Sequence, residues 1–407
     1  MPLSRLLILL GLGLQPLAAA AGKLGLCCEA CTPTTYGPFA NATSWVYRYS
    51  LFVDDADAAA WLVKNDVEVR MPARIPAAVR ERAMLCARRA RCQRHADAAR
   101  PPGRPAPVTG PCAVASQFVP HLAHKHVPLP DGSACNFDAA TKNTPLCTDA
   151  MLDSALAKNA KGLKINFVMG WNEAYDQGNA KAKKKYIAPA DAATYWRTML
   201  QGMAKRANVK LVSPTTGVET HKLQWLADML LACWSQRSAS PGCDVETVAA
   251  FSVHDYKCGE PYWRSNYGTN GTFQTQLGRY LGKAAAGKGK DWAAFVDARP
   301  IWVTETNCNG DNGFPSSGPV SRGEQCARIT GQRAEQKCGQ YGLCGKGSIA
   351  AMESMDSVSR VSWWNTWQQN RNNATKTANA MLVDTTGKLF PAGRALASGL
   401  TNMDCSV

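Results

Sequence analysis

Short runs of apolar residues alternate with stretches of helical pattern along the second half of the chain. The apolar runs predict buried parallel strands, because strands covered on both faces lose the apolar–polar alternation of a half-exposed strand. Such runs cover residues 163–169, 209–214, 248–254, 301–304 and 361–365. The remaining stretches predict helices at 151–160, 189–206, 223–233, 273–286, 326–335, 346–355 and 391–398. Strands that alternate with helices indicate an α/β fold built on a parallel sheet.

The first half of the chain adds further units to this pattern. Residues 44–52 are rich in aromatic and β-branched side chains and predict the first strand. A helix at 54–63 and a second strand at 67–71 follow. So many units favour a closed (β/α)8 TIM barrel over an open dinucleotide-binding sheet. The sequence also contains neither a glycine-rich dinucleotide fingerprint after a strand nor a Walker-type loop.

The barrel pattern is interrupted between about residues 72 and 150. This segment is rich in arginine, proline, histidine and cysteine, and shows little periodicity apart from a helix-like stretch at 77–99. A stretch of this length without clear elements is unusual in a compact domain. We therefore expect an irregular insertion in the N-terminal half of a single catalytic domain that spans 22–400, followed by a tail at 401–407.

The N-terminus has the composition of a secretory signal peptide. Arg5 precedes an apolar run at 6–14, and small residues at 18–21 offer a cleavage site. The 16 cysteines, an even number, suit the disulfides of an exported protein. We expect a signal peptide at 1–21, no membrane-spanning segment after it, and a secreted or cell-wall-associated protein. Candidate N-glycosylation sites lie at Asn41, Asn270 and Asn373.

The net charge of +15 raises the alternative of a nucleic-acid or polyanion partner. Much of the excess lies in residues 70–104 and 181–185, and the first of these stretches contains prolines but no aromatic residues. A solvated loop explains this composition better than a nucleic-acid surface, while contact with a polyanionic substrate or a cell wall stays open. We expect a monomer that binds no nucleic acid.

Two of the apolar runs end in a glutamate. Phe167–Trp171 leads to Asn172 and Glu173, and Ile301–Thr304 leads to Glu305. The C-terminal ends of barrel strands are where barrel enzymes keep their catalytic residues. Glycoside hydrolysis needs two carboxyl groups, one as a proton donor and one as a nucleophile or base. The pattern therefore predicts that the fold brings Glu173 and Glu305 together.

Ordered motifs around these glutamates resemble glycoside hydrolase family 128. They are Gly170–Glu173, Ala188–Trp196, Val209–Pro214, Trp225–Leu226, Cys233, Cys243–Asp244, Phe251–Tyr256, Pro300–Glu305 and Arg360–Trp364. The resemblance covers residues 160–400 well and 45–71 weakly, and nothing in it corresponds to 72–150. It implies a (β/α)8 barrel and a retaining enzyme. It also implies β-1,3-glucan as the substrate, since members of this family act mostly on β-1,3-glucans.

The resemblance also implies a role for individual residues. Glu173 would be the general acid/base and Glu305 the nucleophile. Asn172 would bond the sugar 2-hydroxyl, while His254 and Tyr256 would line the site near the nucleophile. The Tyr256 hydroxyl would then hydrogen-bond the carboxylate of Glu305 and help to keep it ionised.

The chain departs from the family pattern directly after the first glutamate. The family usually has proline there, whereas this chain has Ala174. Because proline stiffens a loop, alanine predicts a looser one, in which Tyr175 and Asp176 replace other contacts.

Aromatic side chains are candidate substrate contacts, because sugar rings stack on them. The candidates are Trp171, Trp302, Trp363, Trp364 and Trp367, with Tyr47 and Tyr49 on the first strand, and we expect Trp363 or Trp364 at the site. The alternative for each tryptophan on a strand is core packing.

The cysteines in the family-like region suggest disulfides rather than a metal centre. Cys233 and Cys243 close a short loop and are expected to pair, and a bridge between Cys258 and Cys308 would tie two loops near the site. The nearest approach to a zinc site is Cys86, Cys92 and His95, but no fourth ligand follows at a zinc-like spacing. We expect no metal and no cofactor.

Taken together, these features predict a secreted retaining endo-glycosidase that hydrolyses β-1,3-glucan by a two-glutamate double-displacement mechanism. Its partner would be a β-glucan polysaccharide or oligosaccharide. Two alternatives stay open: a hydrolase of another β-glycan, and a non-catalytic glycan-binding or cell-wall protein on the same barrel.

Overall fold

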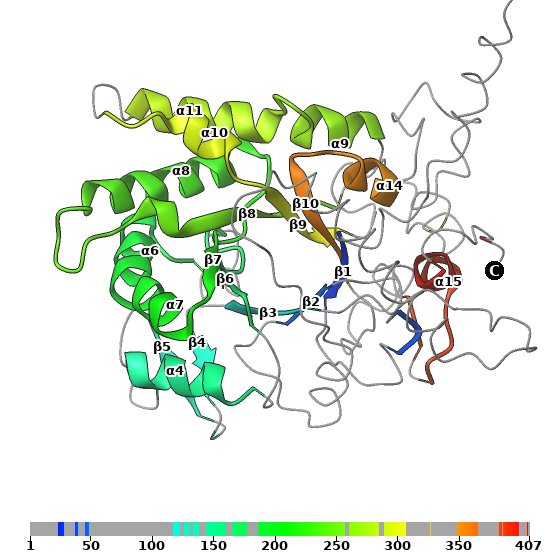
Figure 1. Cartoon of the computed structure of the whole chain (residues 1–407), viewed down its shortest axis with the longest axis horizontal. Helices are drawn as coiled ribbons and strands as arrows, with labels where there is room; N and C mark the ends of the chain where they lie inside the picture. Colours follow the sequence, from blue (N-terminus) through cyan, green and yellow to red (C-terminus); the bar gives the residue numbers. More distant parts are fainter. Residues whose placement is uncertain are drawn as a thin grey trace, which may run out of the picture.

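The structure is a computed structural model, and Figure 1 shows its chain path. The residues that it describes are 23–27, 37–39, 45–48, 117–122, 126–129, 131, 133–137, 144–159, 165–176, 186–256, 260–284, 289–306, 326, 348–364, 382–384, 386–398 and 405.

Eight strands form the centre of the fold. They are β1 (Leu24–Cys27), β2 (Trp45–Arg48), β3 (Gln117–Leu122), β6 (Phe167–Trp171), β7 (Lys210–Val212), β8 (Val248–His254), β9 (Ile301–Thr306) and β10 (Val358–Trp363). Hydrogen bonds join them in the order β1-β10-β9-β8-β7-β6-β3-β2, which is a closed barrel. All the neighbouring pairs are parallel. A separate antiparallel pair, β4 (His126–Pro128) and β5 (Ala134–Asn136), follows β3.

Helices lie before β6, between the consecutive strands from β6 to β10, and after β10. They are α4 (Asp149–Ala157), α6 (Pro189–Tyr195), α7 (Gln201–Ala207), α8 (Thr220–Ser235), α9 (Glu260–Tyr267), α10 (Thr272–Ala284), α11 (Trp292–Asp297), α14 (Ser348–Glu353) and α15 (Pro391–Ala397). A π-helical segment at Trp196–Leu200 joins α6 to α7, and short 3-10 turns lie at Gly37–Phe39 and Val245–Thr247. In Figure 1, α8, α10 and α11 cover one side of the barrel strands and α6 and α7 an adjacent side.

Local sequence explains where several helices begin. Thr148 accepts a hydrogen bond from the Met151 amide at the start of α4, and Asp291 does the same for Ala294 at the start of α11. Pro189 begins α6, where a proline loses no helical hydrogen bond. The predicted alternation of helices with the strands of a parallel sheet is thus confirmed. Within the described residues, a helix does not follow every one of the eight strands.

Two clusters of buried side chains lie on opposite faces of the strands. The larger combines residues of strands and helices, such as Phe251 and Val303, and lies between the barrel and its helical layer. The smaller is built on strands alone and fills the barrel interior: Cys27, Trp45, Met169, Val212, Ala250 and Trp302. The Arg360 guanidinium lies 4.2 Å from the centroid of the Trp302 ring, so a stacked cation closes the barrel near the start of its strands.

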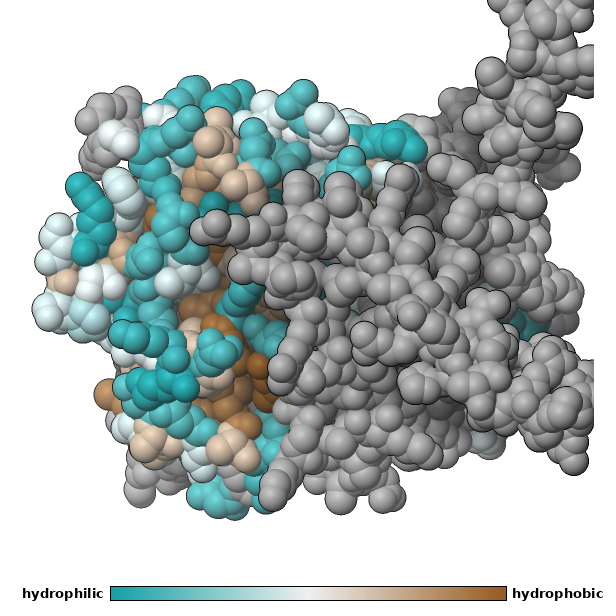
Figure 2. Space-filling model, in the orientation of Figure 1, coloured by the Kyte–Doolittle hydropathy of each residue, from teal (hydrophilic) through white to brown (hydrophobic). Residues whose placement is uncertain are grey.

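The surface carries the polarity expected around such a core. Figure 2 shows hydrophilic residues over most of the coloured surface, with hydrophobic residues gathered toward the middle of the molecule. Among the described residues, Leu146 is the one exposed large hydrophobic side chain. No helix in the described ranges is long and apolar enough to cross a membrane.

The structure corrects the sequence analysis in the N-terminal half. β1 lies within residues 22–40, where no strand was expected, and β3 lies within the segment 72–150 that was expected to be an irregular insertion. β3 contains Pro120 and His121, so it lacks the apolar run typical of a buried strand. The expected strand at 44–52 corresponds to β2, whereas the elements predicted at 54–63, 67–71 and 77–99 lie outside the described residues.

Two further differences concern the helices. α9 and α11 were not predicted, and both are short helices that precede a barrel strand or a longer helix. Of the helix predicted at 326–335, the structure describes Cys326 alone. The other predicted helices from 151 onward are present as α4, α6 with α7, α8, α10, α14 and α15.

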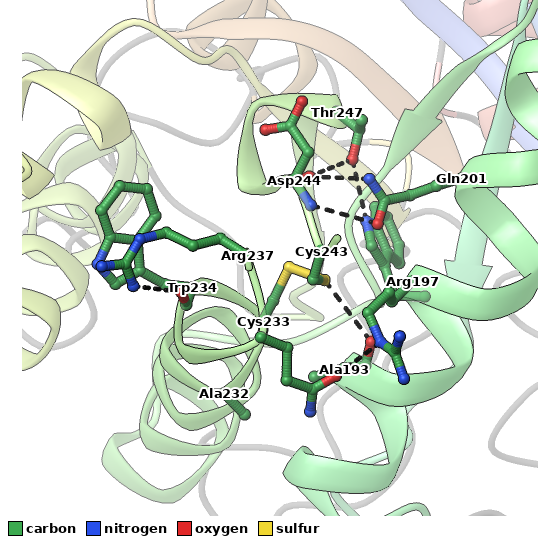
Figure 3. Close-up of a disulfide and its surroundings, with 12 residues drawn as sticks. Ala193, Arg197, Gln201, Ala232, Cys233, Trp234, Arg237, Cys243, Asp244 and Thr247 are labelled. Atoms are coloured by element: carbon green, nitrogen blue, oxygen red, sulfur yellow. Dashed lines mark hydrogen bonds between the residues drawn. A yellow bond between two sulfur atoms is a disulfide. The ribbon is translucent and has the colours of Figure 1, made fainter. Parts of the chain in front are cut away.

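A disulfide joins Cys233 and Cys243, as predicted. It ties the end of α8 to the loop before β8, and the Cys243 sulfur also contacts the Ala193 carbonyl of α6, as Figure 3 shows. Two more disulfides join Cys135 to Cys147 and Cys326 to Cys405. The predicted pair Cys258 and Cys308 lies outside the described residues.

Candidate active site

An extra residue in β9 turns Glu305 toward the barrel interior. Val303 pairs with Val253 of β8, but the next residue of β8, His254, pairs with Glu305. The β10 ladder shifts in the same part of β9. Side chains alternate along a strand, so without this bulge Glu305 would share the outward face of Val303. β-bulges re-aim side chains in this way beside active sites.

β6 has a matching irregularity before the other glutamate. His121 and Leu122 are consecutive in β3, yet they pair with Met169 and Trp171 of β6, which leaves Gly170 as the extra residue. A Cβ atom at Gly170 would lie 2.8 Å from the backbone nitrogen of Pro214, two residues after β7, so a larger residue does not fit. The glycine therefore lets β6 and β7 approach closely just before Asn172 and Glu173.

Glu173 lies in a turn beyond the end of β6. Its φ angle is 49°, a left-handed conformation that is uncommon for a residue other than glycine. A proline at position 174 would push the preceding residue toward extended backbone, away from this conformation. Ala174, the departure from the family pattern, is thus compatible with the backbone that Glu173 adopts. Non-glycine residues in such conformations are frequent at functional sites.

One imidazole ring joins the two glutamates. The Nδ1 atom of His254 lies 3.2 Å from Oε1 of Glu173, and its Nε2 atom lies 3.2 Å from Oε1 of Glu305. His254 and Glu305 are buried, with 2% and 4% of their side chains exposed, whereas the Glu173 side chain is 24% exposed. The fold therefore brings together the two predicted carboxylates and the predicted histidine, from the ends of β6, β8 and β9.

Tyr256 contacts the second oxygen of Glu305. Its hydroxyl donates a hydrogen bond to Oε2, so both carboxylate oxygens of Glu305 have a neighbour of opposite polarity. Burial, followed by the negative charge of Glu173, raises the pKa of Tyr256 well above its ordinary value. The phenol therefore stays protonated and remains a donor at neutral pH. The Trp364 ring lies edge-on, 5.7 Å from the Tyr256 ring.

Tyr175 is a neighbour of Glu173 for which the sequence predicted only general loop contacts. Burial, followed by the charge of Glu173, raises the pKa of the Tyr175 phenol, which therefore stays protonated at neutral pH. The Lys222 ammonium lies 5.2 Å above the Tyr175 ring, and it pairs with Glu219 at 3.2 Å. The N-terminal turn of α8 thus supports the turn that carries Glu173. In the sequence, Ala174 in place of the family's proline indicated an altered loop, but it did not identify Lys222 or α8 as the neighbours of Tyr175.

A buried chain of hydroxyl groups lies close to the carboxylates. Thr304 donates to the Val253 carbonyl at 3.2 Å and accepts from Ser252 at 2.8 Å. Because each hydroxyl has one proton, Ser252 then accepts from Thr215 at 2.9 Å. Thr215 in turn accepts from Nε2 of His121 at 3.3 Å, which assigns a proton to this nitrogen. The chain links the ends of β3, β7, β8 and β9, and sequence reasoning missed it.

The predicted aromatic contacts separate into two groups. Trp364 is half-buried, packs against the interior cluster and meets Tyr256. Trp302 lies deeper in the barrel, in contact with Trp45, and Trp363 is buried in the outer core. The structure therefore brings Trp364 to the carboxylates but not Trp302 or Trp363, which are core residues.

Asn172 lies beside Glu173 at the end of β6. Its backbone N–H donates to the Leu122 carbonyl of β3 at 2.8 Å, and its side chain is buried. Its Oδ1 atom has no hydrogen-bond partner among the described residues. A buried amide oxygen without a partner costs free energy, so Asn172 is well placed to meet a polar ligand.

Within the described ranges no group of three potential metal ligands occurs. Cys86, Cys92 and His95, the nearest approach to a zinc site in the sequence, lie outside these ranges. The residues at the site are two carboxylates, an imidazole, two phenols and an amide, and this set supports proton transfer and nucleophilic attack.

Comparisons with solved structures gave matches to proteins of glycoside hydrolase family 128. An endo-β-1,3-glucanase of subgroup II from Pseudomonas viridiflava has a TM-score of 0.49 at 16% identity, over 93% of this chain and 98% of that chain. The subgroup II endo-β-1,3-glucanase from Sorangium cellulosum has a TM-score of 0.48 at 16% identity, with the same coverage. A subgroup VII oligosaccharide-binding protein from Trichoderma gamsii has a TM-score of 0.45 at 13% identity, over 96% of this chain and 97% of that chain.

A search of curated proteins gave no significant match. The family model described as glycosyl hydrolase catalytic core, in contrast, matches residues 142–396, which is more than half of the chain and includes both glutamates. The chain therefore belongs to the glycosyl hydrolase catalytic core family, which confirms the prediction of a glycoside hydrolase related to family 128.

Proposed function

We propose that this protein is a retaining endo-β-1,3-glucanase. The observation that carries the proposal is the His254 ring, which contacts Glu173 on one side and Glu305 on the other. Two carboxyl groups on either side of one glycosidic bond are the chemical requirement for its hydrolysis. The resemblance of the motifs to family 128 supports β-1,3-glucan as the substrate and retention as the stereochemical course.

The proposed reaction has two steps. In the first, Glu305 attacks the anomeric carbon while Glu173 gives its proton to the glycosidic oxygen, so the bond to the leaving sugar breaks and a glycosyl ester forms on Glu305. In the second, Glu173 takes a proton from water as the water oxygen attacks the anomeric carbon, which releases Glu305 and restores both carboxyl groups. Two inversions at the same carbon give net retention.

The neighbours of each glutamate suit its proposed role. Tyr256 donates to one oxygen of Glu305 and Nε2 of His254 lies 3.2 Å from the other, which favours one direction of attack. Glu173 is more exposed, which suits a group that exchanges protons with the leaving sugar and then with water. Asn172, with its buried amide oxygen, would bind a sugar hydroxyl next to the reacting carbon.

The first test is hydrolysis by the purified full chain. We expect release of oligosaccharides from a soluble β-1,3-glucan, and loss of this release in Glu305→Gln. The control is Glu246→Gln, an exposed glutamate that pairs with Lys290 and Arg299 just before β8, at the opposite end of that strand from His254. Hydrolysis that survives in Glu305→Gln would contradict the proposed mechanism.

The stereochemical test is independent of the rate. Proton NMR of the first products should show the β anomer before mutarotation. Carboxyl groups about 5–5.5 Å apart suit retention, whereas a separation of about 6.5–9.5 Å suits inversion. The α anomer as first product would show that the enzyme inverts by a single displacement.

Binding without hydrolysis is the second candidate function. A pure glycan-binding protein has no need for two carboxylates on one histidine, so the paired glutamates weigh against it. A panel of β-glycans, tested for both binding and product release, separates the candidates. Binding that is unchanged in Glu305→Gln, with no product from any glycan, would favour the binding protein, and product from another β-glycan alone would change the substrate.

We also propose secretion of a monomer after removal of residues 1–21, and a full (β/α)8 barrel. The disulfides Cys135–Cys147, Cys233–Cys243 and Cys326–Cys405 support an oxidising compartment. Expression in a secreting host should give a product in the medium whose N-terminus begins near residue 22. A product that stays inside the cell with its first 21 residues intact would contradict secretion.

A further inference from the structure

Asp255 is a buried carboxylate that the proposed reaction does not use. It lies between His254 and Tyr256 in the sequence, and it is 6% exposed. Its side chain bonds α9, because the hydroxyl groups of Tyr262 and Tyr267 both donate to its Oδ2 atom, at 2.5 and 2.8 Å.

The backbone around Asp255 is tied to the strand that carries the nucleophile. The Asp255 amide donates to the Glu305 carbonyl at 3.0 Å, and the His254 amide donates to the Thr216 carbonyl at 2.8 Å. The segment is therefore held on one side by β9 and the end of β7, and on the other by the two phenols of α9.

The two tyrosines are rigid partners. Tyr267 is fully buried and stacks on Trp263, with ring centroids 5.4 Å apart and an interplanar angle of 28°. Burial, followed by the charge of Asp255, raises the pKa of both Tyr262 and Tyr267, so both remain donors at neutral pH. The Asp255 carboxylate thus meets two fixed donors rather than mobile side chains.

A role in stability alone explains this arrangement poorly. Burying a carboxylate costs free energy, and well-packed apolar residues of similar volume often stabilise a core as well or better. What the carboxylate adds is direction, because two hydroxyl groups from one helix fix its position. Its rigid backbone then fixes the start of the next residue, Tyr256, whose hydroxyl donates to Glu305.

We propose that Asp255 is a positioning residue, which uses Tyr262 and Tyr267 to hold Tyr256 against the nucleophile Glu305. This inference rests on the proposed function, since it assigns Glu305 the role of nucleophile. In this role Asp255 acts on the rate through Tyr256, whose hydroxyl donates to Glu305.

Four variants test the proposal by steady-state kinetics. Asp255→Ala should lower kcat roughly 10- to 100-fold with little change in KM, because a displaced Tyr256 affects the chemical step more than binding. Asp255→Asn should restore most of this loss, because its amide oxygen still accepts both phenols. Tyr262→Phe should lower kcat by a smaller factor, and Tyr280→Phe is the matched control, since this tyrosine lies on α10 and is half-buried.

A double-mutant cycle with Tyr256→Phe identifies the route of the effect. If Asp255 acts through Tyr256, the combination with Asp255→Ala should be no slower than the slower single variant. Multiplication of the two losses would overturn the proposal. An unchanged kcat in folded Asp255→Ala, with only a lower Tm, would also overturn it and leave a structural role.

A crystal structure of the Asp255 variants separates this proposal from the proposed function. In Asp255→Ala the Tyr256 hydroxyl should leave Glu305, and in Asp255→Asn it should stay. If Asp255→Ala does not fold, Asp255→Asn and Tyr262→Phe supply the same kinetic comparison. A wild-type protein without hydrolytic activity would refute the proposed function, whereas an undisplaced Tyr256 in Asp255→Ala would refute the positioning role.

Discussion

The two glutamates reach the same imidazole from different surroundings. Glu305 lies within a barrel strand, is 4% exposed, and has His254 and Tyr256 at its two oxygens. Glu173 lies in a turn beyond its strand, is 24% exposed, and takes a left-handed φ of 49°. One carboxylate is thus buried between two side chains, and the other lies in a partly exposed turn beyond its strand.

This difference matches two chemical demands. A nucleophile gains most from a fixed direction of attack, because misplacement by about 1 Å can cost a hundredfold in rate. A general acid/base must instead pass protons to a leaving sugar and to water, which favours access. Changes around Glu305 should therefore slow every substrate, and changes around Glu173 should depend on the leaving group.

The largest expected effect comes from exchanging each glutamate for glutamine. Glu305→Gln should remove all activity, on glucan and on an aryl β-glucoside alike, because no nucleophile remains. In kcat/KM, which reports the first step, Glu173→Gln should lose about 10²- to 10⁴-fold on glucan but far less on an aryl glycoside whose leaving group needs no proton. Equal losses of Glu173→Gln on both substrates would contradict the assignment of the two roles.

Removal of the Tyr256 hydroxyl should have the next largest effect. Tyr256→Phe keeps the ring beside Trp364 and deletes only the donor to Glu305. We expect a loss of about 10²- to 10³-fold in kcat, the size seen when a donor to a reacting oxygen is removed, on both glucan and aryl glycoside. A loss confined to glucan would place the effect on the acid/base side instead.

A proline at position 174 should disturb Glu173 and leave Glu305 unchanged. Ala174→Pro disfavours the φ of 49° at Glu173, so we expect a loss of roughly tenfold or more on glucan and a smaller one on the aryl glycoside. Steady-state kinetics on both substrates measures it, with Ala188→Pro, just before α6, as a loop control. Full glucanase activity would show that Glu173 does not need this backbone.

The hydroxyl chain near the carboxylates should contribute to stability. Thr304→Val keeps the side-chain volume but removes the group between Ser252 and the Val253 carbonyl. We expect the free energy of unfolding to fall by about 1–3 kcal/mol, because a buried donor loses its partner. Chemical denaturation measures this, and Thr198→Ala, which removes an exposed helical hydroxyl, should change stability by less than about 0.5 kcal/mol. Equal losses of stability in Thr304→Val and Thr198→Ala would contradict a stabilising role for the buried hydroxyl groups.

The smallest effect concerns an ion pair away from the carboxylates. A hydrogen bond from Lys290, helped by Arg299, holds the pKa of Glu246 below its ordinary value of 4.5. A lowered folded-state pKa stabilises the fold above the unfolded pKa, and this stability is lost as the pH falls through the folded pKa. Wild type should therefore exceed Glu246→Gln slightly in stability at pH 7, and the difference should vanish in acid. Glu246 is largely exposed, so salt should also reduce the difference.

Part of this fold is predictable from hydrophobicity alone. The strands β6 to β10 are covered on both faces, so each shows an apolar run. β1 has four residues in a cysteine-rich segment, and β3 contains a proline and a histidine, because its inner face belongs to the polar chain near the carboxylates. The strands that sequence analysis missed are thus too short, in β1, or too polar, in β3, to stand out as apolar runs.

The site was predictable to the extent that it lies at strand ends. Glu173, His254, Tyr256 and Glu305 come together because parallel strands present their ends at one edge of the barrel. The sequence did not predict which face of the barrel each side chain lies on. Single extra residues in β6 and β9 reverse the alternation of inward and outward side chains. Contacts such as those of Asp255 with α9 depend on packing between elements, which no local pattern encodes.

The most direct test of the two-glutamate account is to trap the intermediate on the nucleophile. A 2-fluoro β-1,3-oligoglucoside with an activated leaving group should form a long-lived ester, because fluorine slows both steps while the good leaving group speeds only the first. Intact mass followed by peptide mapping should find one added glycosyl group on the peptide that contains Glu305, and none in Glu305→Gln. An adduct on Glu173, or turnover with no adduct on any residue, would contradict the account.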